Sequence, residues 1–166
     1  DYVDDYGQVR GGLAIFRNAV VQGSEHDGGA TPPLIYDCSG SIYAPGGCGD
    51  PRSIEFEKTN IMHNLETLSD PDSVTVYLGQ KWDDAYYHSQ VEVLPRLSYM
   101  VQYLRQNHNH TTTILGPRIS EERIDLMARL LGLGNGADIP FQWQGYERNK
   151  TYFVKYLLVP TATRCG

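Results

Sequence analysis

The sequence has little positive charge and no long apolar run. It holds 14 Lys and Arg residues against 20 Asp and Glu residues, so the formal net charge at pH 7 is −6. Nucleic-acid binding needs a basic surface that neutralises phosphates, so this balance argues against a nucleic-acid partner. A membrane helix needs roughly 18 consecutive apolar residues, and no stretch approaches that, so we expect no membrane segment in this chain.

Cysteine is also scarce, with three residues in the whole chain. Cys38 and Cys48 flank a loop rich in Gly and Pro, and such a loop can close a disulfide. Cys165 would then have no partner within the chain, which favours a chain cut before that partner. The alternative is that all three cysteines are free thiols in a reducing compartment.

Two tripeptides fit the acceptor pattern for N-linked glycosylation. They are Asn109-His110-Thr111 and Asn149-Lys150-Thr151, and each lies in a polar segment between expected regular elements. Together with the expected disulfide, they favour the lumen of the endoplasmic reticulum or Golgi over the cytosol.

Hydrophobic patterning and turn residues predict an alternation of strands and helices. The expected strands are Leu13–Gln22, Leu34–Tyr36, Ser41–Tyr43, Val74–Leu78, Thr111–Leu115, Ile139–Trp143 and Tyr152–Val159, and residues 44–72 form the least regular stretch. Helical spacing covers Ala85 to Gln106, with a kink or break expected at Pro95. A second helix is expected over Glu121–Leu131, capped by Ser120 and ended by Gly132.

This order of elements predicts an α/β fold. Residues 73–160 read strand, helix, strand, helix, strand, strand, which favours a parallel sheet layer. Residues 1–72 are richer in strands and loops, and we interpret them as an N-terminal extension. Residues 73–166 form the α/β region, and the two parts make one domain that we expect to be truncated at its C-terminus.

Several sequence signatures of catalysis and cofactor binding are absent. The chain has no P-loop, no Gly-x-Gly-x-x-Gly, no Gly-x-Ser-x-Gly and no Cys-x-x-Cys motif. The glycine-rich run 132–136 follows a helix, so we interpret it as a cap and turn. His108 and His110 lack further ligands nearby, and Asp83-Asp84 suits a helix N-terminus better than a metal site. We therefore expect no metal centre.

The most distinctive feature is a ladder of polar residues in the first expected helix. His88, Glu92 and Arg96 are spaced four apart, which places all three on one helix face. That face follows a strand of the expected sheet, where open α/β sheets bind ligands. A histidine held by a carboxylate can act as a general base or bind phosphate. The alternative is a stabilising surface ladder.

Residues 74–97 resemble the hallmark segment of glycosyltransferase family 61, which includes plant xylan arabinosyl- and xylosyltransferases. Tyr86 and His88 match its Tyr-x-His element, Glu92 matches its carboxylate, and Leu94–Leu97 match its closing apolar-Pro-Arg-Leu sequence. The family also includes animal enzymes that add N-acetylglucosamine to EGF domains. The resemblance is specific around residues 82–97 and weaker over the remaining chain.

The resemblance implies an inverting enzyme that takes its sugar from a nucleotide-sugar donor. Such an enzyme has two Rossmann-like domains facing a cleft, the B-type glycosyltransferase arrangement, and needs no cofactor or catalytic metal. Residues 73–166 would then be the Rossmann-like region of the acceptor-side half. The donor nucleotide would be bound mainly by a missing C-terminal half, and the acceptor would be a glycan or glycoprotein.

The resemblance also assigns roles to individual residues. His88 would be the general base, and Glu92 would orient it or be the base itself. Arg96 would contact a phosphate or pair with Glu92, and Tyr86 and Tyr87 would bind substrate.

One position departs from the family pattern, because Ala85 stands where many members have Asn. This departure keeps other interpretations open. The chain could be a non-catalytic carbohydrate- or protein-binding module derived from such a domain, or an unrelated α/β protein whose ladder is structural. In isolation, we expect the chain to be inactive.

Overall fold

A β-sheet with two helices at one end forms the described part of the protein. The computed structural model describes residues 13–22, 34–37, 42–43, 65–68, 73–79, 94–107, 111–133, 139–147 and 150–160. Its elements are β1 (Leu13–Gln22), β2 (Leu34–Tyr36), β3 (Ile42–Tyr43), β4 (Leu65–Thr67), β5 (Val74–Tyr77), α2 (Leu94–Asn107), β6 (Thr112–Gly116), α3 (Glu121–Leu131), β7 (Phe141–Gly145) and β8 (Thr151–Pro160).

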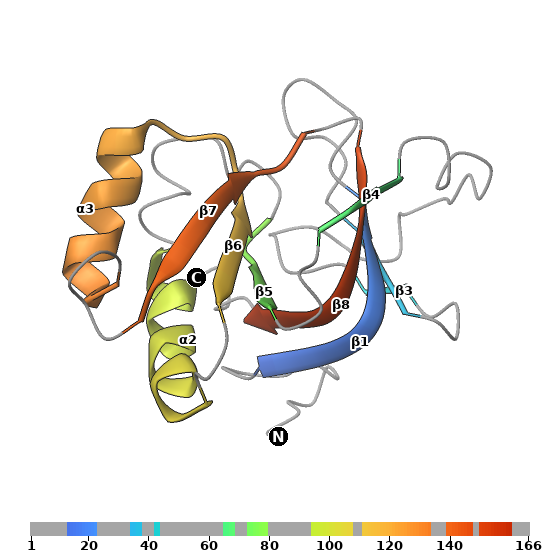
Figure 1. The fold of residues 1–166 in the computed structure, drawn as a ribbon, viewed down its shortest axis with the longest axis horizontal. Coiled ribbons are helices and arrows are strands. Elements are labelled where there is room, and N and C mark those ends of the chain that lie inside the picture. Colours follow the sequence, from blue (N-terminus) through green and yellow to red (C-terminus); the bar gives the residue numbers. More distant parts are fainter. Residues whose placement is uncertain are drawn as a thin grey trace, which may run out of the picture.

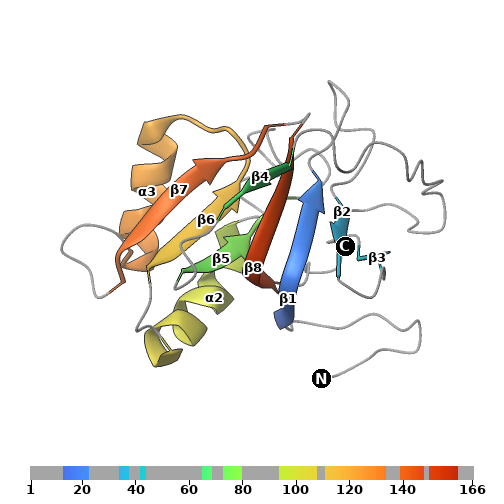
Figure 2. The same ribbon diagram turned by 45° about the vertical axis from the view of Figure 1, so that its right-hand side comes forward.

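The sheet has eight strands in the order β3-β2-β1-β8-β5-β6-β7, and β4 also pairs with β8. The pairs among β8, β5, β6 and β7 are parallel, whereas β1 joins β8 antiparallel and β2 and β3 continue antiparallel. Both helices lie at the β5–β7 end, and β1–β3 form the other end (Figures 1 and 2). The expected α/β class is confirmed, and the strands within residues 73–160 are parallel as predicted. The antiparallel strands β1–β3 make the whole sheet mixed.

The expected strand–helix–strand unit is present as β5, α2 and β6. Val74 pairs with Thr112 and Tyr77 with Leu115 in parallel register. The described helix begins at Leu94 with Pro95 in its first turn, where proline is tolerated because the first-turn N–H groups have no helical partner. The predicted helical residues 85–93, which include His88, lie outside the described residues.

The second helix has the predicted bounds, and its two ends behave differently. Ser120 occupies the N-cap position, but its hydroxyl makes no capping bond. Its backbone carbonyl instead accepts from the N–H groups of Arg123 and Ile124 at 3.0 and 3.1 Å. Gly132 ends the helix in the left-handed conformation, with φ 65°, as glycine at this position commonly does.

The N-terminal segment is part of the same sheet as the C-terminal segment. β1 runs along the whole of β8, from the Leu13–Pro160 pair to the Gln22–Thr151 pair. Because a strand has two edges, β4 and β5 share the other edge of β8, with β4 at its start and β5 toward its end. No break in the sheet marks the boundary that we predicted at residue 72, and that boundary stays a prediction.

β4 is a strand that we did not predict, within residues 44–72, which we expected to be the least regular stretch. Leu65–Thr67 form a three-residue strand parallel to the start of β8. Leu65 is the only apolar residue of the three, so the sequence shows no alternating hydrophobic pattern. The side chain of Leu65 is exposed in the structure. The pairing of β4 with a distant strand makes it a strand, and local sequence carries no signal of that pairing.

Both faces of the sheet are buried by separate apolar clusters. One cluster joins the two helices to the sheet and includes Val76, Leu97, Met100, Ile114 and Ala128. The other lies on the opposite face and includes Tyr77, Leu115, Val154 and Leu157. Neither of the helices described by the structure is long and apolar enough to cross a membrane.

The core-facing side of β1 changes within the strand at Asn18. Ala14 and Phe16 pack against the second cluster before this residue, and Ala19 and Val21 belong to it afterwards. Successive side chains of a regular strand alternate between faces, so this sequence of positions requires a local change of backbone conformation. Asn18 supplies it with φ 55°, a left-handed conformation that asparagine tolerates better than most residues.

The paired strand β8 changes its core-facing side at the same level. Tyr152 and Val154 belong to the second cluster before Lys155, and Leu157 and Val159 belong to it afterwards. The ladder between β1 and β8 keeps one register on both sides of this level. Both strands curve together in Figure 1, so the sheet turns here without slipping its register.

Candidate functional site

Most of the predicted site residues lie outside the part of the chain that the structure describes. These are Tyr86, Tyr87, His88 and Glu92, the cysteines Cys38, Cys48 and Cys165, and the glycosylation acceptors Asn109 and Asn149. The base, the disulfide and the glycosylation sites therefore stay predictions. The segment that holds Tyr86 to Glu92 joins Gly79, which follows β5, to Leu94, which begins α2.

Arg96 is the predicted site residue that the structure places. Its side chain is buried with 0% exposure in the first turn of α2. Its Nε and Nη2 atoms donate to the carbonyl oxygen of Pro160 at 3.3 and 3.1 Å. Arg96 thus ties the start of α2 to the end of β8. Substrate contact by Arg96 stays a prediction.

The carboxyl ends of β5, β6 and β7 lie at one edge of the sheet because the three strands are parallel. Open α/β sheets bind their ligands outside this edge. Two strands end in glycines that neighbouring side chains cover closely. A Cβ atom on Gly116 would meet the Trp143 ring, and one on Gly145 would lie 2.9 Å from Cγ of Arg118. A larger residue at either position would displace these side chains.

Four charged side chains meet beside this edge, and we refer to them as the edge cluster: Glu66, Arg118, Glu147 and Lys150. Oε1 of Glu147 lies 3.0 Å from Nη2 of Arg118 and 3.1 Å from Nζ of Lys150. Nζ of Lys150 also lies 2.9 Å from Oε2 of Glu66. The hydrogen bonds that Lys150 donates to Glu66 and Glu147 raise the pKa of Lys150 above its ordinary value.

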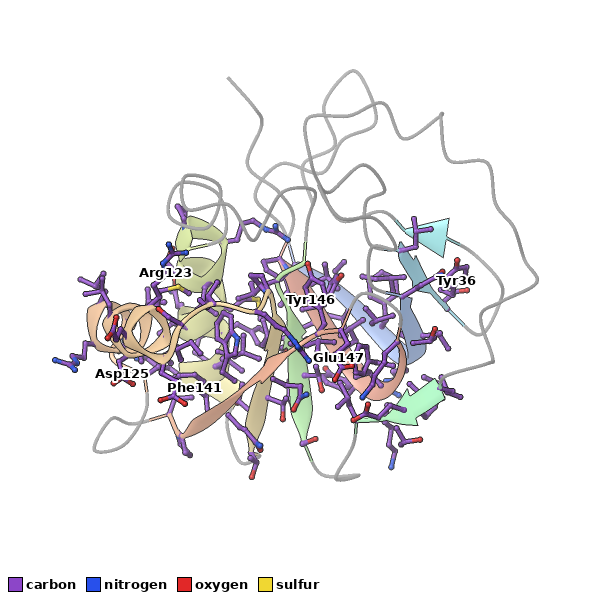
Figure 3. The ribbon with its side chains drawn as sticks, turned by 90° about the horizontal axis from the view of Figure 1, so that it is seen from above. Tyr36, Arg123, Asp125, Phe141, Tyr146 and Glu147 are labelled. Carbon is purple, nitrogen blue, oxygen red and sulfur yellow. The ribbon has the colours of Figure 1, made fainter. Side chains whose placement is uncertain are left out.

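Buried tyrosines lie next to the edge cluster. The backbone N–H of Glu147 donates to the hydroxyl of Tyr152 at 2.7 Å, and burial raises the pKa of Tyr152. The rings of Tyr77 and Tyr146 lie 6.2 Å apart at an angle of 49°. Figure 3 shows Tyr146 and Glu147 near the middle of the molecule, between α3 and the β2 end of the sheet.

The edge cluster is balanced in charge, with two cations and two carboxylates in mutual contact. Among the residues that the structure describes, no group of three His, Cys, Asp or Glu side chains could hold a metal ion. Through these ion pairs the cluster joins the connections after β6 and β7 to β4.

Sequence reasoning missed the edge cluster. Its members are contributed by β4, by the connection after β6 and by the connection between β7 and β8, and Glu66 is 84 residues from Lys150. The available signal is the position of Arg118 and Glu147, each two residues after a glycine that ends a parallel strand. Recognising that signal requires the strand pairing to be known.

Comparisons with protein-family models, curated proteins and solved structures find no significant match to this chain.

Proposed function

We propose that this chain is the acceptor-side half of an inverting glycosyltransferase similar to family 61. It would act in the Golgi or endoplasmic reticulum lumen on a glycan or glycoprotein acceptor. The supporting observation is the unit of β5, α2 and β6, because the family-like segment joins the end of β5 to the start of α2. Ligands of open α/β sheets bind at such connections.

In this proposal His88 removes the proton from the acceptor hydroxyl as that oxygen attacks the anomeric carbon of the donor. The bond from that carbon to the nucleotide diphosphate breaks on the opposite face, so the configuration inverts. Glu92 orients His88 or acts as the base itself. Tyr86 and Tyr87 contact the acceptor sugar.

Arg96 supports this arrangement whether or not it contacts a phosphate. Its buried guanidinium fixes the first turn of α2 against Pro160, which is the last residue of β8. The segment with His88 and Glu92 leads directly into that turn in sequence. A fixed helix start limits the positions that these side chains can take, and restricted geometry is a large part of catalysis.

Substitution of His88 tests the proposal in the full-length enzyme. Nucleotide release with acceptor should fall about a hundredfold or more in His88→Ala, since general-base catalysis contributes roughly 10²–10⁴. Glu92→Gln should have a smaller effect if Glu92 orients His88, and a larger one if Glu92 is the base.

The matched control is Gln90→Ala, an uncharged neighbour in the same segment, which should leave the rate unchanged. Circular dichroism should show that each variant is folded. Full activity in folded His88→Ala would make the ladder structural. Sugar binding without any transfer by the full-length wild type would favour the non-catalytic binding module.

A further inference from the structure

The hydroxyl residues of the two predicted sequons occupy different environments. Thr151, which completes the sequon of Asn149, is the first residue of β8 and is 4% exposed. Thr111, which completes the sequon of Asn109, is exposed and precedes β6. The enzyme that glycosylates a sequon recognises the asparagine together with this hydroxyl residue, so access to the threonine matters as much as access to the asparagine.

The backbone at Thr151 is paired on both sides. Thr151 is the partner of Gln22 in β1 and of Leu65 in β4. The residue between Asn149 and Thr151 is also held, because Nζ of Lys150 contacts Glu66 and its N–H donates to the Glu147 carbonyl at 3.1 Å. An enzyme could draw this tripeptide into its own site only after the start of β8 had separated from both neighbours.

Among the described residues, the strand pairing of β6 begins at Thr112 and does not include Thr111. Thr111 lies one residue before β6, and its carbonyl oxygen accepts from the N–H of Val74 at 3.0 Å. Its exposed side chain can be approached while that bond persists.

We propose that folding separates the two sequons in time: Asn109 stays a glycosylation acceptor in the folded protein, and Asn149 is an acceptor only before β8 pairs. This inference rests on the lumenal location in the proposed function. In each transfer a bond forms between the asparagine amide nitrogen and the anomeric carbon of a lipid-linked oligosaccharide. The bond from that carbon to the lipid diphosphate breaks, the diphosphate leaves with the electron pair, and the amide nitrogen loses one proton.

The experiment uses the unglycosylated chain, purified from bacteria and shown to be folded by circular dichroism. The chain is incubated with an oligosaccharyltransferase and its lipid-linked oligosaccharide, and mass spectrometry of peptides measures occupancy at both sites in the same molecules. Asn109 should be modified at least about tenfold faster than Asn149, because local strand separation limits the second reaction. Occupancy at a similar rate, faster modification of Asn149, or no modification of Asn109 would overturn the proposal.

Two short peptides that contain the sequons provide the control for intrinsic preference. Their relative rates should be similar, and the selectivity should appear only in the folded chain. The variants Asn109→Gln and Asn149→Gln, each with one remaining sequon, should reproduce the rate of the site that remains. The location is tested separately in secretory cells: absence of glycan at both sites there would contradict the lumenal assignment, whereas the rates in vitro test the proposed selectivity.

Discussion

Asn18 has a backbone conformation that costs free energy at most residue types. Its φ of 55° allows the core-facing side of β1 to change within the strand. We predict that Asn18→Gly leaves the free energy of unfolding within about 0.5 kcal/mol of wild type, because glycine adopts positive φ freely. Asn18→Val should lower it by about 1–2 kcal/mol, because a β-branched residue is strained there. Urea denaturation measures both.

The matched control is Ile15→Val, an exposed position in the same strand with ordinary backbone geometry. It should change stability by less than about 0.5 kcal/mol, as surface substitutions usually do. Equal effects of valine at both positions would show that Asn18 is not strained in the native state.

Tyr103 links α2 to β8 through a pH-sensitive contact. The hydrogen bond with Tyr156, followed by burial, raises the pKa of Tyr103 above its ordinary value of 10.0. A raised pKa favours the protonated form in the fold, so this stabilisation is complete below pH 10 and is lost as the pH rises through the folded-state pKa. We predict that the free energy of unfolding falls above about pH 10. Tyr103→Phe should show a shallower fall.

The test is urea denaturation from pH 8 to pH 11 for wild type and Tyr103→Phe. The raised pKa values of Tyr152 and Lys150 contribute in the same direction in both proteins, so the difference between the two curves isolates Tyr103. At pH 8 the variant should be less stable by about 1 kcal/mol or less, the net value of one hydrogen bond. Parallel curves would contradict the role of Tyr103.

At the scale of elements, the sequence predicts best where local chemistry determines the structure. β1, β2 and α3 have their predicted bounds. In sequence, β1 is followed by Gly23 and β2 by a segment with Gly40, and Gly132 supplies the left-handed cap of α3. Each of these signals lies within a few residues of the element that it ends.

The elements and contacts that sequence reasoning missed depend on residues far apart in the chain. β4 is a strand because it meets β8, and the edge cluster exists because β4, β6 and β7 bring their charges to one place. The spacing of His88, Glu92 and Arg96 predicted that Arg96 lies in a helix. It did not predict that the Arg96 side chain is buried against Pro160. Strand pairing, which a single sequence does not encode locally, accounts for these differences.

Arg96 provides a prediction at this scale, because it joins two elements. Arg96→Met would leave the Pro160 carbonyl without the two donors that hold it, at a cost of about 2–4 kcal/mol in unfolding free energy. Arg96→Lys keeps the charge but lacks the planar fork, so it should restore only part of this stability. Hydrogen exchange should increase in both variants at the start of α2 and at the end of β8. Unchanged stability with lost activity would instead indicate that Arg96 serves a substrate.

At the scale of the whole molecule, β8 joins the N-terminal strands and the α/β region in one sheet. It pairs with β1 along one edge and with β4 and β5 along the other, and it contributes to both apolar clusters. The N-terminal strands therefore complete the same sheet that carries the proposed site. A shortened chain that begins at residue 73 would expose an edge of β8, so activity assays should use all 166 residues or a longer chain.

The last prediction concerns the activity of the isolated chain. We predict that it transfers no sugar, although it folds. An inverting transfer requires the donor to be held in line with the acceptor hydroxyl, and this orientation can supply several kcal/mol of the barrier. One half of a cleft can orient one reactant and not both. The proposed division gives the acceptor to this chain and the donor nucleotide to the missing half.

The measurement is nucleotide release from a panel of nucleotide sugars, with and without glycan acceptors, by the isolated chain and by the full-length enzyme. The full-length enzyme should release nucleotide in the presence of acceptor, and the isolated chain should show no release above buffer. The isolated chain should still bind acceptor glycans, because the acceptor contacts are proposed to lie between β5 and α2. Transfer by the isolated chain would place the donor site within these 166 residues, since both reactants would then have to be oriented by this one sheet.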